Sequence, residues 1–344
     1  MPRVTLQTIA DEVGVSRQTV SNAFSRPDQL SGTLRARILD VADALGYRGP
    51  DPTARALAVG RTGVVGVVLT ERTRTALVDA SMPLFLSGVA AELGRHDQDM
   101  LVISGAPDEP DSPSDGNRIR RCAVDGLIAF SLSNADPLWH AMTERGVPLV
   151  VVDQPRTVGI GWAGIDDRLA ARLAVAHLVG LGHERIGILV MRVRRGGVTG
   201  MLTAERRRLG EFPVTEERLL GAEDALGARE LAPVGVWECA TVDDVPAGVA
   251  ALVELGVTAI FAHADTLALA ALAALRSRGV HVPGAMSVVG LDDAPAAAAA
   301  GLTTVHQPHE HKGAAAVRLL AEPSPGEVLL PVDLRVRAST GPPC

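Results

Sequence analysis

The stretch GVSRQTVSNAF, residues 14–24, decides the fold of the first part of the chain. Ser16 is a residue type that caps helices, and it stands directly before a segment that can form a helix from Arg17 to about Ser25. Val20 and Phe24 are four residues apart, so they lie on the same side of that helix. The pattern predicts a short helix with one apolar face and a polar first turn.

The residues on either side of this stretch supply two further helices. Thr5 can cap a helix over Leu6–Val13, and Gly14 provides the positive φ that the following turn requires. A third helix is expected over Thr33–Leu45, because its apolar residues fall on one face and Gly46 follows as a C-terminal cap. The segment therefore predicts a helix-turn-helix unit of three short helices. An ordinary helical hairpin with a solvated polar turn is the alternative.

A helix-turn-helix unit that binds DNA places the start of its second helix in the major groove. Arg17 can bond guanine, while Gln18 and Asn22 can bond adenine, so these side chains are the candidates for reading bases. The hydroxyl groups near the same helix are better suited to phosphates. The candidate DNA-binding residues of this unit are Thr5, Ser16, Arg17, Gln18, Thr19, Ser21 and Asn22.

Charge is distributed unevenly along the 344 residues. The net charge is -7, yet residues 1–62 hold eight Arg against six Asp or Glu, a balance of +2 that leaves -9 for the rest. A basic-leaning head on an acidic body is typical of a DNA-contacting module attached to a regulatory domain. The sequence has neither a secretory signal nor an apolar run of the roughly 20 residues that cross a bilayer, so we expect a cytoplasmic protein without a membrane partner.

The chain carries no motif that indicates an enzyme. We find no Gly-rich phosphate loop, no GxSxG and no HExxH pair, and the three cysteines have no metal-ligand spacing. We therefore expect no catalytic residue, no metal and no cofactor. His183, in LGHERIG, is expected to be a packed or capping residue.

Residues 49–62 connect the predicted head to the body. Pro50 and Pro52 favour an extended entry, and Thr53–Val59 can form two helical turns with Arg55 and Leu57 on opposite sides. Such a helix is too short to be stable alone in water. We expect it to form against a DNA minor groove, where an apolar side chain can wedge between bases. A flexible connector with Leu57 packed on the body is the alternative.

The body alternates short apolar runs with amphipathic helices. TGVVGVVL, DMLVIS, DGLIAFS and PLVVVD precede residue 160, and RIGILV, TAIFAH and SVVGLD follow it. Continuous apolar strands between helices predict doubly wound parallel sheets, and two successive sets predict two lobes. Ligands of such sheets collect beyond the carboxyl ends of the strands, where Asp153, Asp265 and Asp292 stand. Capping a helix or pairing with a basic group is the ordinary alternative for each of these carboxylates.

The chain resembles the lactose-repressor (LacI/GalR) family of bacterial transcription regulators. VTLQTIADEVGVSRQTVSNAF, LGYRGPDPTARALAVGRTGVVGVV, GIDDRLAARLAVAHLVGLGHERIGIL and LTTVHQP carry the resemblance, in the family's order and at about its spacing. It implies an all-α head, a hinge and a periplasmic-binding-protein-like core that binds an effector between two lobes. It also implies a homodimer on a palindromic operator, with Leu57 as the wedging hinge leucine. Many members have Arg where this chain has Asn22, so its operator is expected to differ at that base.

The resemblance assigns the domains and adds effector contacts. Residues 1–48 would be the head, 49–62 the hinge and 63–344 the core, with lobes over about 63–160 and 161–290 and a final segment 291–344. Asp292 matches the family's effector aspartate, and Asp293 is expected to be structural. In AERRRLGEF we identify Arg208 as the effector arginine, three residues before a Gly-aromatic pair that is disturbed here by Glu211. Alignment on Gly210 selects Arg207 instead, and a solvated run of arginines at a helix start is the ordinary alternative. The candidate effector-binding residues are Ser81, Met82, Phe85, Asp153, Arg208, Asp265, Asp292 and His309.

These features predict a DNA-binding repressor that responds to a small molecule such as a sugar. Ala264 replaces a polar residue of the family, and the Arg motif is disturbed, so a regulator without a small ligand is the runner-up interpretation. Trp162 and Trp237 can stack on a sugar ring or belong to the core. A free solute-binding protein would have no use for Arg17 or Leu57.

Overall fold

The computed structural model describes residues 4–49, 56, 59–69, 81–104 and 116–344. The chain divides into two compact units, Met1–Gly63 and Val64–Cys344. Arg55 and Leu57, the candidate DNA contacts of the hinge, lie outside the described residues.

The first unit is the predicted helical head. Its helices are α1 (Leu6–Val13), α2 (Arg17–Ser25) and α3 (Gly32–Ala44). Gly14 ends α1 at φ +77°, and the Ser16 hydroxyl accepts a hydrogen bond from the backbone N–H of Thr19 at 3.0 Å. The buried core comprises Ile9, Ala10, Val13, Val20, Ala23, Ile38 and Ala42. Leu45 was expected on the inner face but is 37% exposed, because α3 ends one residue before it.

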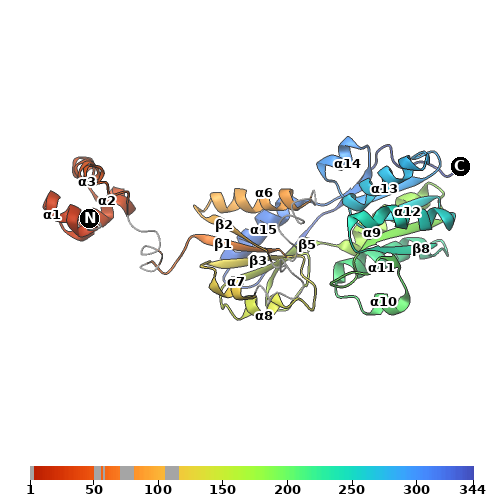
Figure 1. Cartoon of the computed structure of the whole chain (residues 1–344), viewed down its shortest axis with the longest axis horizontal. Helices are drawn as coiled ribbons and strands as arrows, with labels where there is room; N and C mark the ends of the chain where they lie inside the picture. Colours follow the sequence, from red (N-terminus) through yellow and green to blue (C-terminus); the bar gives the residue numbers. More distant parts are fainter. Residues whose placement is uncertain (1–3, 50–55, 57–58, 70–80, 105–115) are drawn as a thin grey trace. The chain divides into compact units, whose positions relative to one another are not determined.

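The second unit contains two sheets whose central strands are parallel, as expected (Figure 1). The first sheet has the strand order β12-β5-β4-β3-β1-β2, and every neighbouring pair is parallel. Its strands are β1 (Val64–Leu69), β2 (Asp99–Ser104), β3 (Gly126–Phe130), β4 (Leu149–Val152), β5 (Gly161–Ile165) and β12 (Glu327–Leu330). One face packs on α6 (Ser81–Gly94) and α15 (His309–Ala321), and the other on α7 (Gly116–Arg121) and α8 (Leu138–Thr143).

The second sheet has the order β13-β11-β10-β9-β6-β8-β7, with antiparallel strands β13 and β7 at its edges. Its strands are β6 (Ile186–Met191), β7 (Gly200–Met201), β8 (Gly235–Cys239), β9 (Ala259–Ala262), β10 (Ser287–Asp292), β11 (Thr303–His306) and β13 (Asp333–Arg335). Helices α9 (Asp167–Gly180) and α11 (Pro213–Gly227) cover one face, and α12 (Val245–Glu254) and α13 (Asp265–Ser277) cover the other. The short helices α10 (Ala204–Arg208) and α14 (Pro295–Ala299) lie in connections.

The two sheets define two lobes that are not consecutive in sequence. Strand β5 belongs to the first sheet although it follows residue 160, where we expected the lobe boundary, and β12 joins it from near the end of the chain. The chain therefore passes between the lobes after β5, after β11 and after β12. These crossings bring the carboxyl ends of strands from both sheets toward one region, which is where a ligand site of such folds lies.

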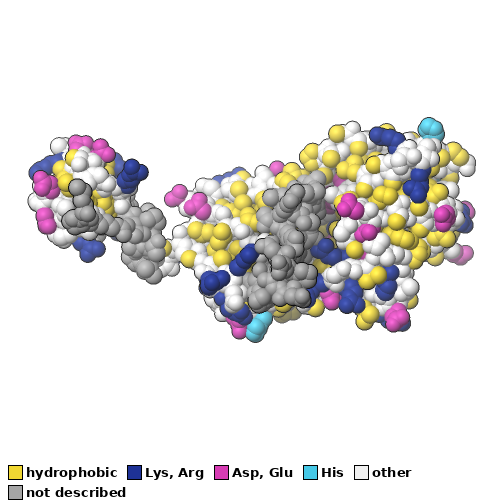
Figure 2. All heavy atoms as spheres, in the orientation of Figure 1, with side chains coloured by type: hydrophobic (Ala, Val, Ile, Leu, Met, Phe, Trp, Pro, Cys, Tyr) yellow, Lys and Arg dark blue, Asp and Glu magenta, His cyan; other side chains and the backbone are white. Residues whose placement is uncertain are grey.

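The surface of the second unit carries hydrophobic and charged side chains of both signs, intermixed on the face shown in Figure 2. Among the residues that the structure describes, no helix has both the length and the apolar character needed to cross a membrane. His183 is buried, and its ring nitrogens form hydrogen bonds with the Thr258 and Ser287 hydroxyls and the Gly341 carbonyl. It is thus a packed residue, as expected.

Candidate effector cavity and nucleic-acid interface

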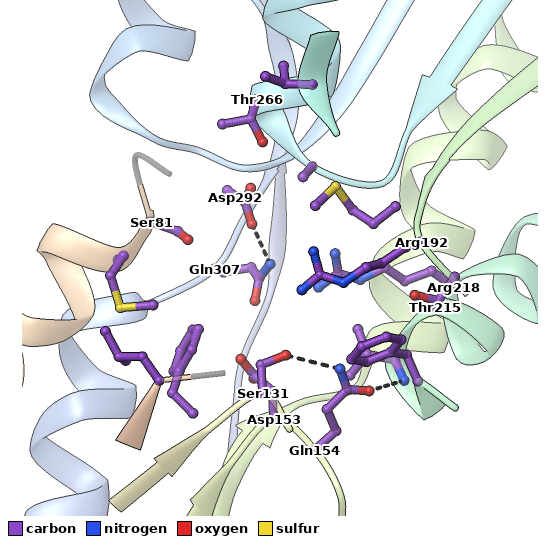
Figure 3. Close-up of a pocket in the computed structure, with 18 of the residues that line it drawn as sticks. Ser81, Ser131, Asp153, Gln154, Arg192, Thr215, Arg218, Thr266, Asp292 and Gln307 are labelled. Carbon is purple, nitrogen blue, oxygen red and sulfur yellow. Dashed lines mark hydrogen bonds between the residues drawn. The ribbon is translucent and has the colours of Figure 1, made fainter. Parts of the chain in front are cut away.

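A cavity of about 510 Å³ lies between the lobes at the carboxyl ends of their strands. Its size is in the range of pockets that hold small molecules. The wall is largely apolar, with polar side chains from both lobes aimed into it (Figure 3). Its polar lining comprises Ser81, Ser131, Asp153, Gln154, Arg192, Thr215, Arg218, Thr241, Asp243, Thr266, Asp292, Gln307 and His309.

The two strand-end aspartates that face this cavity have unusual backbones. Asp153, after β4, has φ +64°, and Asp292, at the end of β10, has φ +143°. Residues other than glycine seldom adopt positive φ, and where they do the conformation often serves a site. The turn directs the Asp292 carboxylate so that it accepts hydrogen bonds from Gln307 Nε2 at 2.7 Å and from the backbone N–H of Asp265 at 3.1 Å. Each lobe thus contributes one strand-end aspartate to the cavity wall.

Arg218 of α11 is the buried cation of this site. Its Nε donates to Asp167 Oδ1 at 2.8 Å and its Nη1 donates to the His263 carbonyl at 2.5 Å. Only 11% of its side chain is exposed, and the exposed part lies in the cavity wall opposite Asp292 and Gln307 (Figure 3). A guanidinium held by two partners keeps a fixed orientation, so it can present a remaining N–H to a ligand oxygen.

The structure places Arg208 elsewhere, so our choice of the cavity arginine was wrong. Arg208 is exposed at the end of α10 and does not line the cavity. The other arginines of this run form ion pairs outside the cavity: Arg206 pairs with Glu238, and Arg207 pairs with Glu216 and Glu223. The run therefore supplies no cavity arginine. The signal that identifies Arg218 was present in the sequence, since it stands three residues before Gly221. Ala222 follows in place of the aromatic residue we looked for.

Two other candidates also lie outside the cavity lining. Phe85 is fully buried in the first lobe, where its ring packs 4.5 Å from that of Phe130. Asp265 is 1% exposed, and its carboxylate accepts hydrogen bonds from the Ala294 N–H at 2.9 Å and the Thr304 hydroxyl at 2.6 Å. Burial, together with the neighbouring Asp292 carboxylate, raises the pKa of Asp265 to about 7. Both residues support the cavity from behind.

The remaining effector candidates line the cavity. They are Ser81, Met82, Asp153, Asp292 and His309. His309 is 4% exposed, and its Nε2 lies 3.5 Å from Asp292 Oδ1. Asp293 instead points away into an ion pair with Arg337 at 2.5 Å, in agreement with its expected structural role.

Several cavity residues could not be inferred from the strand-end pattern. Gln307 lies on the crossing from β11 to α15, and Gln154 follows Asp153. Phe212 lines the wall from the connection before α11, with the Arg192 guanidinium 5.6 Å from its ring centre. Trp162 is buried in the core of the first lobe and Trp237 is packed against that of the second, so neither serves as a stacking platform in this cavity.

The head presents its polar residues on α2. Arg17 and Gln18 are exposed, and Asn22 is half-buried. Gln18 Nε2 donates to Asn22 Oδ1 at 2.9 Å, and Asn22 Nδ2 donates to Gln29 Oε1 at 3.2 Å. The two carboxamides are therefore already aligned on one side of the helix. The Thr5 and Ser16 hydroxyls cap α1 and α2, and Thr19 and Ser21 lie half-buried on α2.

A helix-turn-helix head in one chain with a two-lobed, cavity-bearing α/β core defines the class of transcriptional regulators that have a periplasmic-binding-protein-like domain. Residues 175–340 match the model of the periplasmic binding protein-like domain, and residues 5–49 match that of the bacterial regulatory proteins of the lacI family. The HTH-type transcriptional regulator Rv3575c of Mycobacterium tuberculosis is 39% identical over 99% of this chain and 98% of its own. The chain belongs to the lacI family, and it is a DNA-binding transcriptional regulator rather than an enzyme.

Solved structures show the same arrangement of the chain. A complex of the transcriptional regulator CelR with cellobiose has a TM-score of 0.69 and 27% identity, over 98% of this chain and 100% of that one. The lac repressor dimer bound to operator and the anti-inducer ONPF has a TM-score of 0.80 and 24% identity, over 99% and 100%. The latter likeness concerns the fold alone.

Proposed function

We propose that this regulator is a homodimeric repressor whose affinity for a palindromic operator is controlled by a small hydroxylated molecule, such as a sugar, bound in the cavity. The observation that carries the proposal is the cavity itself, because Asp153 of one lobe faces Asp292 and Arg218 of the other across it. Carboxylates accept hydrogen bonds and a guanidinium donates them, so the wall suits a ligand that carries several hydroxyl groups.

The similar proteins support the same function. The CelR structure contains cellobiose, and the lac repressor structure is a dimer bound to operator and a small molecule. A ligand that binds both lobes would change how they are arranged and so couple to operator affinity, typically by about 1–3 kcal/mol. The alternative, a regulator that binds no ligand, was based partly on the disturbed Arg motif. Arg218 in the cavity removes that reason, although Ala264 remains in the wall.

For DNA, we propose that Arg17, Gln18 and Asn22 read base edges, while Thr5, Ser16, Thr19 and Ser21 contact the backbone. Arg55 and Leu57 would complete the interface from the hinge. Fluorescence anisotropy on palindromes from the gene's own promoter tests this, and Arg17→Ala is expected to weaken binding by about 1–3 kcal/mol while relaxing specificity at one base. Arg278→Ala, an exposed site on the second lobe, removes the same charge and serves as the control. Equal affinities for Arg17→Ala and the wild type would contradict the assignment.

For the ligand, thermal shifts across a panel of sugars and nucleosides identify a binder. Arg218→Lys keeps the positive charge but loses the planar, forked donors, so the shift is expected to shrink strongly. Arg208→Lys is the matched control, because Arg208 is exposed and outside the cavity lining. A shift that is retained in Arg218→Lys and lost in Arg208→Lys would overturn the assignment of the site.

A further inference from the structure

A continuous set of hydrogen bonds joins Asp153 and Asp292, the two strand-end aspartates of the cavity. Lys312 Nζ of α15 donates to Asp153 Oδ1 at 2.5 Å and to Gln307 Oε1 at 2.5 Å. Gln307 Nε2 then donates to Asp292 Oδ1 at 2.7 Å. Asp153 and Lys312 belong to the first lobe, and Asp292 ends a strand of the second. Figure 3 shows Gln307 between Asp292 and Asp153, with its bond to Asp292 dashed.

The chemistry of these groups fixes the direction of every bond. An ammonium group has donors but no acceptor, and an ionised carboxylate has acceptors but no donor. The Gln307 amide can satisfy both neighbours in one orientation alone, with its oxygen toward Lys312 and its nitrogen toward Asp292. The amide is therefore held through its oxygen by Lys312 of the first lobe and through its nitrogen by Asp292 of the second.

The position of Lys312 argues against a purely packing role. Its side chain is fully buried, and 11% of the Asp153 side chain is exposed. Burying an ammonium group is costly, and a well-packed apolar side chain of similar volume usually gives equal or greater stability. A buried ion pair of this kind is best attested where it specifies one arrangement over others. Here the arrangement is that of the lobes, because Gln307 lies on a segment that crosses between them.

We propose that Lys312 and Gln307 are positioning residues, which hold Asp153 of the first lobe and Asp292 of the second at a fixed separation across the cavity. That this link matters for ligand recognition rests on the proposed function, which assigns Asp153 and Asp292 as groups that bind the ligand. The backbone N–H of Gln307 also bonds the Asp292 carbonyl at 3.2 Å, so Gln307 stays with the second lobe. Rotation of one lobe against the other would therefore pull on the bond between Lys312 and Gln307.

A reversal of hydrogen-bond polarity tests the link. In Gln307→Glu, two carboxylates face each other and the bond to Asp292 is lost. In Asp292→Asn, the single amide oxygen cannot accept from both Gln307 and the Asp265 N–H. In the double variant, the new amide at position 292 can donate to the new carboxylate at position 307 and still accept from the Asp265 N–H, at unchanged net charge. A residue that contributes to stability alone would give no such rescue.

The readout is the distance between the lobes in the ligand-free protein, measured by pulsed electron paramagnetic resonance. One nitroxide is placed at Val158→Cys, a fully exposed site between β4 and β5, and the other on the exposed Cys344. Cys122→Ser removes the half-exposed thiol, whereas Cys239 is fully buried with its pKa raised to about 12 by burial, so it stays unlabelled. Dilution into unlabelled protein removes distances between copies.

We expect one narrow distance in the parent, a longer or broader distribution in Gln307→Glu, and return to the narrow distance in the double variant. Lys312→Met is expected to broaden the distribution as well. Arg168→Ala, which breaks a salt bridge with Asp224 inside the second lobe, is the control and should leave the distance unchanged. Circular dichroism checks that each variant is folded, and the Gln307 variants suffice should Lys312→Met fail to fold.

Two results would overturn the proposal: a parent-like distance in Gln307→Glu, or a double variant as broad as Gln307→Glu. Neither distance measurement depends on ligand binding, which the thermal shifts test separately. Failure of the proposed link and failure of the proposed ligand site can therefore be told apart.

Discussion

At the scale of single residues, the carboxylates around the cavity differ in what they do. Asp153 and Asp292 face the cavity, Asp293 is held by Arg337, and Asp265 is buried behind the wall. All lie at or shortly after strand ends, so their sequence positions alone do not separate these roles. The separation comes from position, because Asp153 and Asp292 line the cavity, whereas Asp265 is 1% exposed and does not.

Asp265 gives this difference a measurable consequence. Its pKa in the folded chain is about 7, raised by burial and by Asp292, against an ordinary value of 3.8. Between about pH 4 and pH 7 the folded state holds a proton that the unfolded state has released, so stability falls as the pH rises through this window. The loss is up to about 4 kcal/mol, from 1.36 kcal/mol for each pKa unit.

Asp265→Asn should remove this pH dependence. The amide oxygen can still accept from the Ala294 N–H, and the amide nitrogen can donate to Thr304, so the packing is kept. Urea unfolding at pH 5 and pH 8 measures the effect, and the wild type is expected to lose more stability between them than the variant does. Asp99→Asn, at an exposed carboxylate in β2, is the control. Equal slopes in the wild type and Asp265→Asn would contradict the prediction.

At the scale of elements, the second lobe depends on how closely α9 and α11 approach. A Cβ atom at Gly221 would lie 2.1 Å from the backbone oxygen of Arg168, which is far inside van der Waals contact. The same helix carries Arg218 one turn earlier, so the glycine that permits the close approach also sets the height of the guanidinium in the cavity wall. Helix packing and the ligand site are thus linked through a single element.

Gly221→Ala should therefore destabilise the second unit, by about 1–3 kcal/mol or more, because the helices must move apart. Gly227→Ala in the same helix is the matched control, since a Cβ there meets nothing within 4 Å and its φ is not positive. Its effect should be neutral or slightly stabilising. The free energy of unfolding in urea distinguishes the two, and a Gly221→Ala protein as stable as Gly227→Ala would show that the helices can separate freely.

At the scale of the whole molecule, the sequence predicted local features better than distant ones. Helices α1 and α2 have the expected bounds, because Thr5, Ser16 and Gly14 define their ends within a few residues. Strands with continuous apolar runs were also found. Strand β12 was missed because it lies half-exposed at a sheet edge, and β8 because Glu238 interrupts its apolar run.

The cavity was predicted less completely, for a physical reason. Its wall combines residues from crossings and connections, such as Gln307 and Phe212, whose meeting depends on how the lobes pack. The spacing of residues along the chain carries no information about how the lobes pack. Arg218 shows the opposite case, since its spacing to Gly221 was readable but a neighbouring run of arginines offered a competing match.

The division into two units predicts two thermal transitions. Each unit has its own buried core, one around Val20 and the others within the two lobes, so each is able to unfold by itself. At about 0.7 kcal/mol per residue, calorimetry should show unfolding enthalpies of about 40 kcal/mol for the first unit and about 200 kcal/mol for the second. Val20→Ala, at a fully buried position, should lower the small transition and leave the large one in place. A chain of residues 64–344 should retain the large transition at an unchanged temperature. A single transition that Val20→Ala shifts as a whole would mean that the head and the core unfold as one cooperative body.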